Sequence, residues 1–459
     1  MAERQDGIMA AILENIKKYM SEFRDSEFKK IVAGITISEL LDLWDNLSEK
    51  EELKIFTMLD LEKKVDLITS LPPAKQEALI TSLTAENKKI LLEEMEPDDI
   101  TDFIQSVSPE VRKFVWNNLS EEAKEETKFL LRFDEDDAAG LMTPRYLAIQ
   151  ANLTVKQALN WVRKNVKDVE TAYYIYVLDQ MKRLIGIVSL KDLLSANDED
   201  RINSIMVKNV ISVREDTDQE DVAKILETYD LIALPVVDRY NRLLGIVTFD
   251  DIIDVIRDEQ TEDVYKMSAM AGNTERYLDS SVWDLVKKRI PWLTILLLAA
   301  TLTTNVLAHY KPILEVAVVL SFFIPIVTGT GGNAGSQSST LMIRGLATDE
   351  IHFDDILKVF LKESLVSIII GISMGLLTIG RSMYLPPYIS FHVALVVGTS
   401  MVFVIIFATL VGAFFPLLIH KAGLDPTVMA GPLMATIIDV TGLTIYFQTA
   451  RLLLGLHLG

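Results

Sequence analysis

The amino-acid sequence predicts a multidomain protein with an all-α superhelical N domain, an α/β tandem repeat, a connecting helix and a five-helix α transmembrane domain. Three observations predict this fold class. An apolar residue recurs every 12 positions near the amino terminus, a 19-residue segment is repeated 59 positions later, and five long apolar runs follow residue 289. The expected boundaries are residues 1–133, 134–256, 257–283 and 284–459.

The charge of the chain is concentrated in its first part. Residues 1–283 hold 56 acidic and 35 basic side chains, whereas residues 284–459 hold nine and ten. A strongly acidic surface repels nucleic acid and attracts cations, so we expect no nucleic-acid partner. The chain has no cysteine, which excludes disulfides and thiolate metal sites. The amino terminus lacks the pattern of a signal peptide, so the first 280 residues are expected in the cytosol.

The N domain carries the 12-residue repeat. The recurring positions are Leu47, Leu59, Leu71, Leu83, Met95, Val107, Leu119 and Leu131. Residues that favour a helix start often follow them, namely Ser48, Asp60, Pro72, Thr84, Ser108 and Ser120. This spacing predicts short helices of about eight residues stacked into a superhelix, with one or two added helices at residues 6–30. Asp98 and Asp102 are expected on one face of a helix. They either favour the start of that helix as solvated acids or bind a metal ion.

The α/β repeat pairs residues 176–194 with residues 235–253. Each copy predicts a strand, a turn, a strand and a helix, and the pattern resembles a pair of CBS domains. In that family a Ser/Thr-x-x-Asp motif after the second strand can bind a nucleotide ribose, and Ser189–Asp192 and Thr248–Asp251 match it. The same spacing suits a helix cap, so nucleotide binding, of ATP for example, is one of two interpretations.

The second copy and the segment after it contain more acids than a helix cap requires. These acids are Asp216, Asp218, Glu220, Asp230, Asp250, Asp251, Asp254, Asp258, Glu259, Glu262 and Asp263. Hard cations such as Mg²⁺ take oxygen ligands, and packed carboxylates repel one another unless cations neutralise them. The pattern predicts either a solvated helix or a segment that folds up when Mg²⁺ is abundant and opens when it is scarce.

The last part of the chain predicts a multi-pass helical membrane domain in contact with lipid. The expected spans are residues 290–308, about 312–343, 364–380, 393–419 and 426–450. Five spans place the termini on opposite sides. With the N-terminus cytoplasmic and the C-terminus external, cytosolic segments carry Lys287, Lys288, Arg289, Arg344, Lys358, Lys362 and Lys421, against Lys311, Arg381 and Arg451 outside. This excess agrees with the positive-inside rule.

Two features interrupt the apolar pattern at membrane depth. Asp439 is the only charge in residues 426–450, and an ionised carboxylate there needs a partner, water or an ion. Residues 325–340 hold four glycines after Pro325, which predicts a broken helix whose carbonyls can coordinate a hydrated ion. Helix packing would explain either feature alone, but together they favour a pore. A symmetric dimer would place two Asp439 side chains around one axis.

Several motifs together extend the comparison to the whole chain. They are residues 136–146, 247–267, 329–348, 425–427 and 430–447, and with the domain order they resemble the MgtE-type magnesium channels. The resemblance implies a homodimer whose pore lies between the protomers, lined by the second and fifth membrane helices. Asp439 matches the pore acid that holds hydrated Mg²⁺ through its waters, and Gly331, Gly332 and Asn333 match a pore-side turn.

The resemblance also implies a cytosolic Mg²⁺ sensor. The matching acids are Asp98, Asp102, Asp218, Asp230, Asp251, Asp254, Glu259 and Glu262, to which we add the neighbouring Asp250 and Asp263. Residues 257–280 match a plug helix that closes the pore when these sites are filled. We therefore expect a Mg²⁺-selective channel for magnesium uptake across the inner membrane, closed by cytosolic Mg²⁺.

Other functions are considered beside this one. A coupled secondary transporter of another divalent cation, such as Co²⁺ or Mn²⁺, is the main alternative. A nucleotide-sensing regulator with a membrane anchor is disfavoured, because an anchor would not keep Asp439. No enzyme is expected, since the five histidines form no His-x-x-x-His pair or nucleophile elbow.

Overall fold

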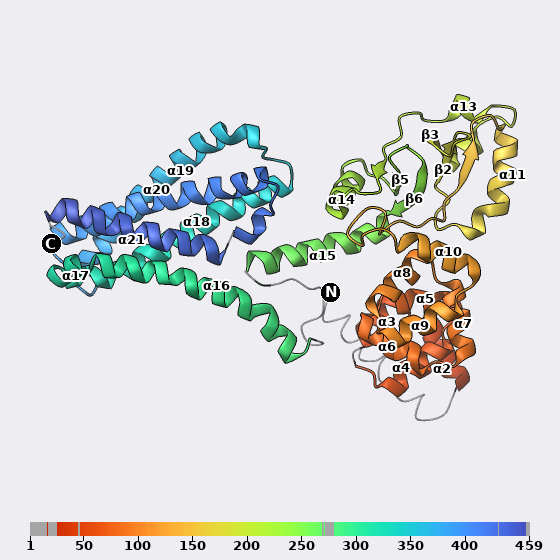
Figure 1. Cartoon of the computed structure of the whole chain (residues 1–459), viewed down its shortest axis with the longest axis horizontal. Helices are drawn as coiled ribbons and strands as arrows, with labels where there is room; N and C mark the ends of the chain where they lie inside the picture. The colour runs from red at the N-terminus through yellow and green to blue at the C-terminus, as the bar shows by residue number, and fades with distance from the viewer. Residues whose placement is uncertain are drawn as a thin grey trace. The chain divides into compact units, whose positions relative to one another are not determined.

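The computed structural model describes residue 16 and residues 25–44, 46–268, 270, 280–429 and 431–455 (Figure 1). The chain divides into two units, Met1–Arg257 and Asp258–Gly459. Most of the helical stretch expected at residues 6–30, and residues 271–279 of the connecting stretch, lie outside the described residues.

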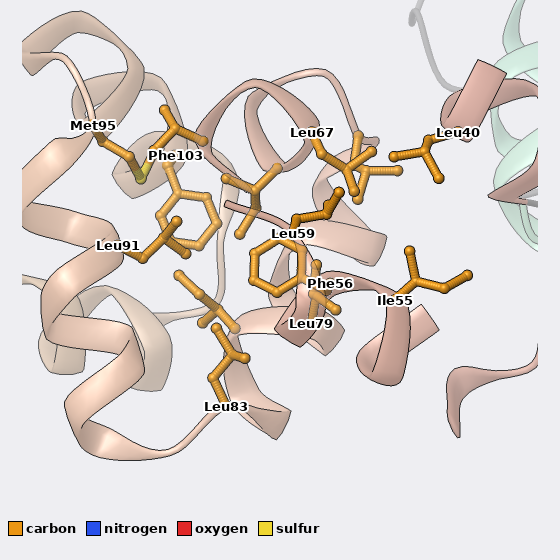
Figure 2. Close-up of a cluster of buried hydrophobic side chains, with 14 of the residues drawn as sticks. Leu40, Ile55, Phe56, Leu59, Leu67, Leu79, Leu83, Leu91, Met95 and Phe103 are labelled. Carbon is orange, nitrogen blue, oxygen red and sulfur yellow. The ribbon is translucent and has the colours of Figure 1, made fainter. Parts of the chain in front are cut away.

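The N domain is a stack of short helices, as its repeat predicts. They are α2 (Asp25–Gly34), α3 (Ile37–Trp44), α4 (Glu49–Met58), α5 (Leu61–Thr69), α6 (Pro73–Ser82), α7 (Ala85–Glu94), α8 (Pro97–Ser106), α9 (Pro109–Asn118) and α10 (Glu121–Leu130). The recurring apolar residue lies directly after a helix: Leu59, Met95 and Leu119 each adopt an extended backbone there. These side chains are buried, and Figure 2 shows part of the resulting core. Leu131, at 37% exposure, is the exception.

Three of the expected residues, Asp60, Thr84 and Ser120, cap helix starts through side-chain hydrogen bonds, whereas Pro72 and Ser108 form no such bond. Asp60 accepts a hydrogen bond from the Lys63 amide at 3.0 Å, and Ser120 accepts one from the Ala123 amide at 3.1 Å. Because each cap satisfies a backbone group that the helix leaves unpaired, it defines where the next helix begins. The alternation of a capping residue and a buried apolar residue therefore produces the 12-residue period.

The two CBS copies have the same topology. The first contains β1 (Ala148–Gln150), α11 (Val155–Asn165), η1 (Val166–Asp168), β2 (Tyr174–Leu178), β3 (Leu184–Ser189), α12 (Leu190–Ser195) and α13 (Ile202–Ile205). The second contains β4 (Val213–Arg214), α14 (Gln219–Thr228), β5 (Ala233–Val237), β6 (Leu243–Thr248) and α15 (Phe249–Met267). In each sheet the first two strands are parallel and the last two antiparallel. The offset of 59 residues thus relates β2 and β3 of the first copy to β5 and β6 of the second.

Within the described residues, the second unit contains five helices long and apolar enough to cross a membrane, which confirms the expected number. Its elements are α16 (Val282–His309), α17 (Lys311–Val316), η2 (Val318–Phe323), α18 (Ile324–Ala347), η3 (Phe353–Asp355), α19 (Ile356–Tyr384), α20 (Phe391–Lys421), η4 (Pro426–Met429) and α21 (Pro432–Leu454). The last turns of α15 also belong to this unit.

The glycine-rich segment does not break the second span, so that expectation is wrong. Helix α18 runs without interruption from Ile324 to Ala347, with Pro325 in its first turn, where a proline needs no hydrogen-bond donor. The interruption lies earlier, at Ala317, between α17 and η2. The glycines act instead in helix packing, because a side chain at Gly335 would overlap Ile438 of α21.

Helices α18, α20 and α21 approach one another through these glycines. A Cβ atom at Gly331 would lie 2.8 Å from Val404 of α20 and 3.2 Å from Ile438. A Cβ atom at Gly412 of α20 would overlap the backbone oxygen of Gly335. Gly331 and Gly335 thus form a glycine notch in α18, and Ile438 packs into it. This contact fixes how α21 is rotated about its own axis.

We expect Gly412→Ala to destabilise the membrane unit strongly. The new methyl group would meet backbone rather than a flexible side chain, and overpacking of this kind costs about 1–3 kcal/mol. The control is Gly380→Ala in α19, where a Cβ atom would meet nothing within 4 Å. Thermal unfolding of the detergent-solubilised protein measures both variants. Equal unfolding temperatures for the two would contradict this packing.

Candidate cation sites

Acidic side chains gather where α8 and α15 begin. Asp98 and Asp99 lie in the first turn of α8, and Asp250 and Asp251 in the first turn of α15, where the helix dipole favours negative charge. The two helix starts face a common region, because the charge of Asp251 acts on the carboxyl groups of Asp98 and Asp99. Two elements far apart in sequence thus contribute acids to one place.

Glu170 completes this cluster from the first CBS copy, in the segment before β2. Carboxylate oxygens of Glu170, Asp250 and Asp251 all lie within 4.8 Å of one another. The hydroxyl group of Thr248, at the end of β6, donates to Asp251 Oδ2 at 2.6 Å. Sequence reasoning missed Glu170, because it belongs to no motif and lies far along the chain from its partners.

The cluster is electrostatically frustrated without a cation. Burial, and then the neighbouring charges of Asp251 and Glu96, raise the pKa of Glu170 to about 8. Burial likewise raises the pKa of Asp251 to about 6, although the hydrogen bond from Thr248 lowers it. Burial and nearby acids raise the pKa of Asp99 and of Asp102 to about 7.

Several buried carboxylate oxygens of this region lack a donor. Glu96 Oε2, Asp98 Oδ1 and Glu170 Oε2 accept no hydrogen bond from any described residue. Burial, followed by the charges of Asp99 and Glu170, raises the pKa of Asp98 well above its ordinary value. Buried acceptor oxygens of this kind are the donor atoms that a hard cation such as Mg²⁺ takes. The residues therefore fit a divalent cation with part of its water shell.

The other predicted sensor acids have different surroundings. Asp218 is exposed and caps α14 by accepting a hydrogen bond from the Glu220 amide, and Asp230 is exposed after that helix. Asp254 forms an exposed ion pair with Arg257 at 3.1 Å. Glu259, Glu262 and Asp263 lie on the part of α15 that belongs to the second unit.

The two candidate nucleotide motifs are not equivalent. Ser189 Oγ donates to Asp192 Oδ2 at 2.6 Å and accepts from the Asp192 amide at 3.0 Å, so the motif does cap α12. Asp192 is exposed, whereas Thr248 is only 3% exposed. The second motif is therefore engaged by the acidic cluster, and the first is the accessible one.

The membrane acid Asp439 lies in the second turn of α21 and is half-buried. In the described part of the chain, no basic side chain forms an ion pair with it. The preceding residue, Ile438, is fully buried against the glycine notch of α18. Of the predicted pore-side residues on α18, Gly331 is buried, Gly332 has open space beside it and Asn333 is exposed.

The fold and these sites define a multi-pass membrane protein that joins an acidic CBS-containing module to a helical bundle, in which Asp439 forms no ion pair with the described residues. Three family models match the chain. They are the MgtE divalent cation transporter over residues 324–449, the MgtE intracellular N domain over residues 35–136, and the CBS domain over residues 138–199 and 202–258.

Known proteins resemble the chain along most of its length. The magnesium transporter MgtE of Thermus thermophilus is 42% identical over 362 residues, covering 78% of this chain and 79% of the relative. The magnesium transporter MgtE of Enterococcus faecalis is 38% identical and covers 72% of each chain. A crystal structure of the cytosolic domain of the Mg²⁺ channel MgtE in complex with ATP matches 53% of this chain with 36% identity and a TM-score of 0.52. The chain belongs to the MgtE family of divalent cation transporters.

The raised pKa values predict how pH affects the stability of the metal-free protein. A carboxyl group whose pKa is higher in the folded state favours folding when protonated, and this contribution is lost as pH rises through the folded pKa. We therefore expect the metal-free full-length protein to become less stable between about pH 6 and pH 8.

Mg²⁺ should reverse this loss, because its ligands must be deprotonated. The rise in Tm on adding Mg²⁺ is expected to be several degrees larger at pH 8 than at pH 6, with NaCl of equal ionic strength as the control. The combined variant Glu170→Gln with Asp251→Asn should abolish most of the difference. A Mg²⁺ effect that is independent of pH would contradict a site built from these acids.

Proposed function

We propose that this protein is a Mg²⁺-selective channel that mediates magnesium uptake across the inner membrane and closes when cytosolic Mg²⁺ fills its acidic sites. The observation that carries the proposal is Asp439, a half-buried acid at membrane depth with no basic partner among the described residues. Magnesium transporters that are 42% and 38% identical to the chain support the choice of ion.

The pore chemistry follows from the reluctance of Mg²⁺ to lose water. In a homodimer, two Asp439 side chains would lie around one axis and hold the hydrated ion through its waters. Gly332 leaves open space and Asn333 an exposed side-chain amide on α18, so this amide can orient the water shell. With the N-terminus cytoplasmic and the C-terminus external, the membrane potential drives entry by about 2.3 kcal/mol per charge per 100 mV.

Closure rests on the cluster at the start of α15. A cation between Glu170, Asp250 and Asp251 would relieve their mutual repulsion and tie the first CBS copy to α15. Asp98 of the N domain lies near Glu170 and Asp251, whose charges act on its carboxyl group. The ion would therefore hold the N domain, the first CBS copy and α15 together. When Mg²⁺ is scarce, repulsion returns and favours separation, which releases the end of α15 that serves as a plug.

We also propose that the CBS pair binds ATP at the first copy. The support is the accessible Ser189–Asp192 motif and the similarity to a cytosolic domain solved with ATP. Thr248 and Asp251, which the corresponding motif would use in the second copy, already belong to the acidic cluster.

The pore role of Asp439 predicts that Asp439→Ala reduces Mg²⁺ uptake at least tenfold, since one lost charge contact of about 1.4 kcal/mol changes a rate tenfold. Uptake into liposomes that contain a Mg²⁺-sensitive dye measures this effect. Asp349→Ala is the matched control, because Asp349 lies in the loop after α18, outside the described spans. Undiminished uptake by folded Asp439→Ala protein would exclude the pore role.

The same liposomes separate a channel from a coupled transporter of Co²⁺ or Mn²⁺. A channel passes Mg²⁺ when the membrane potential is the sole driving force, whereas a coupled transporter requires a counter-ion gradient. We expect Mg²⁺ uptake without such a gradient and slower uptake of Co²⁺ and Mn²⁺. Dependence on an imposed Na⁺ or proton gradient would favour the alternative.

The sensor role predicts a shift of closure. Asp251→Asn and Glu170→Gln should each raise the cytosolic Mg²⁺ concentration for half-closure by about threefold to tenfold, because each removes one charged ligand. Asp216→Asn is the control, since Asp216 is exposed and pairs with Arg214 at 2.9 Å. The measurement is Mg²⁺ flux at a series of Mg²⁺ concentrations on the side of the membrane that holds the first unit, Met1–Arg257. A midpoint equal to that of Asp216→Asn would exclude the sensor role of that residue.

A further inference from the structure

The last turn of α15 contains a lysine that bridges two acids within the second unit. Lys266 Nζ lies 2.9 Å from Glu262 Oε1, one turn earlier on α15, and 2.9 Å from Asp425 Oδ2. Asp425 belongs to the loop between α20 and α21. Only 27% of the Lys266 side chain is exposed, so solvent screens these contacts less than it screens a surface ion pair.

Asp425 in turn organises the loop that leads into α21. Its Oδ1 accepts hydrogen bonds from the Thr427 amide at 2.8 Å and from Thr427 Oγ1 at 2.5 Å, which caps η4. The other oxygen of Asp425, Oδ2, contacts Lys266. The Asp425 carboxylate therefore joins the end of α15 to the segment that leads into α21, the helix that carries Asp439.

A second contact joins the same two elements. The backbone oxygen of Met267 lies so close to Gly431, the residue before α21, that a Cβ atom there would overlap it. Glycine is thus required at this approach of the α15 backbone to the α21 start. Neither contact depends on a metal ion.

We propose that Lys266 is a built-in latch that holds the end of α15 against the α20–α21 loop and stabilises the closed pore without any bound ion. The proposal rests on the proposed closure of the pore by α15 and identifies a fixed cation that acts beside Mg²⁺. The ammonium neutralises Glu262 and Asp425 as a divalent cation would, but at every Mg²⁺ concentration. The Lys266 ion pairs thus favour the closed pore before Mg²⁺ binds, and Mg²⁺ at the start of α15 stabilises the closed pore further.

The protonation of these groups agrees with the latch. Partial burial alone lowers the pKa of Lys266, but the hydrogen bonds and charges of Glu262 and Asp425 outweigh burial and raise it overall. Burial by itself raises the pKa of Asp425. The hydrogen bonds from Thr427 and Lys266 outweigh burial, so the pKa of Asp425 lies below its ordinary value. The ion pair therefore persists over the physiological pH range.

The test is Mg²⁺ flux through the full-length protein in liposomes, as a function of Mg²⁺ on the side of the membrane that holds the first unit. Lys266→Gln should raise the Mg²⁺ concentration for half-closure about fivefold and leave residual flux at saturating Mg²⁺. Lys266→Arg, which keeps the charge, should stay within twofold of the natural chain. Asp425→Asn should reproduce the effect of Lys266→Gln, and the double variant should add little.

The control is Lys358→Gln, which removes an exposed lysine paired with Asp355 on the same unit. A Lys266→Gln midpoint equal to that of this control, or effects of Lys266→Gln and Asp425→Asn that add fully, would overturn the latch.

Hydrogen exchange of residues 424–431 separates failure of the latch from failure of the proposed function. Exchange there should be faster in Lys266→Gln than in Lys358→Gln. Faster exchange in a protein whose flux ignores Mg²⁺ would support the latch and contradict the proposed closure. Unchanged exchange in a protein that Mg²⁺ closes normally would overturn the latch and keep the proposed closure.

Discussion

Burial of carboxylates that have no basic partner among the described residues is the constraint on which both candidate sites depend. In the acidic cluster, carboxylate oxygens of Glu170 and Asp251 lie within 4.8 Å of each other, and two unit charges at that limit repel by about 3.5 kcal/mol at an effective dielectric constant of 20. Burial, and after it the charges of Asp251 and Glu96, raise the pKa of Glu170. A protein keeps such groups together only if protons or cations neutralise them for part of the time. Asp439 in the membrane unit and the acidic cluster in the first unit both need such neutralisation. The same kind of cation can therefore bind at each site.

The surrounding structure makes these sites specific in different ways. In the membrane unit, rigid packing sets the geometry: Ile438 enters the glycine notch of α18, and this orients the next residue, Asp439. In the first unit the acids lie at helix starts and in a connecting segment, where small movements separate them. Helix α15 carries Asp251 in its first turn and Lys266 in its last.

Periodic and repeated features of the fold could be predicted from the sequence, whereas contacts between distant segments could not. The 12-residue period and the offset of 59 residues each repeat a local rule, a cap or a strand pair, so they are visible without tertiary information. The glycine-rich segment was misjudged, because glycine weakens an isolated helix but allows close packing between helices. Glu170 and Lys266 were missed for a related reason: their partners are brought to them by the fold alone. Asp439 could be singled out from the sequence as a candidate, since a charge in an apolar run is visible without knowledge of its surroundings.

The most direct test of the central claim is the current through the full-length protein in a planar bilayer with Mg²⁺ as the only permeant cation. The account predicts a current without any counter-ion, which reverses at the Mg²⁺ equilibrium potential and declines as Mg²⁺ rises on the side of the membrane that holds the first unit. A current that is absent while Mg²⁺ uptake persists, or one that ignores Mg²⁺ on that side, would contradict it.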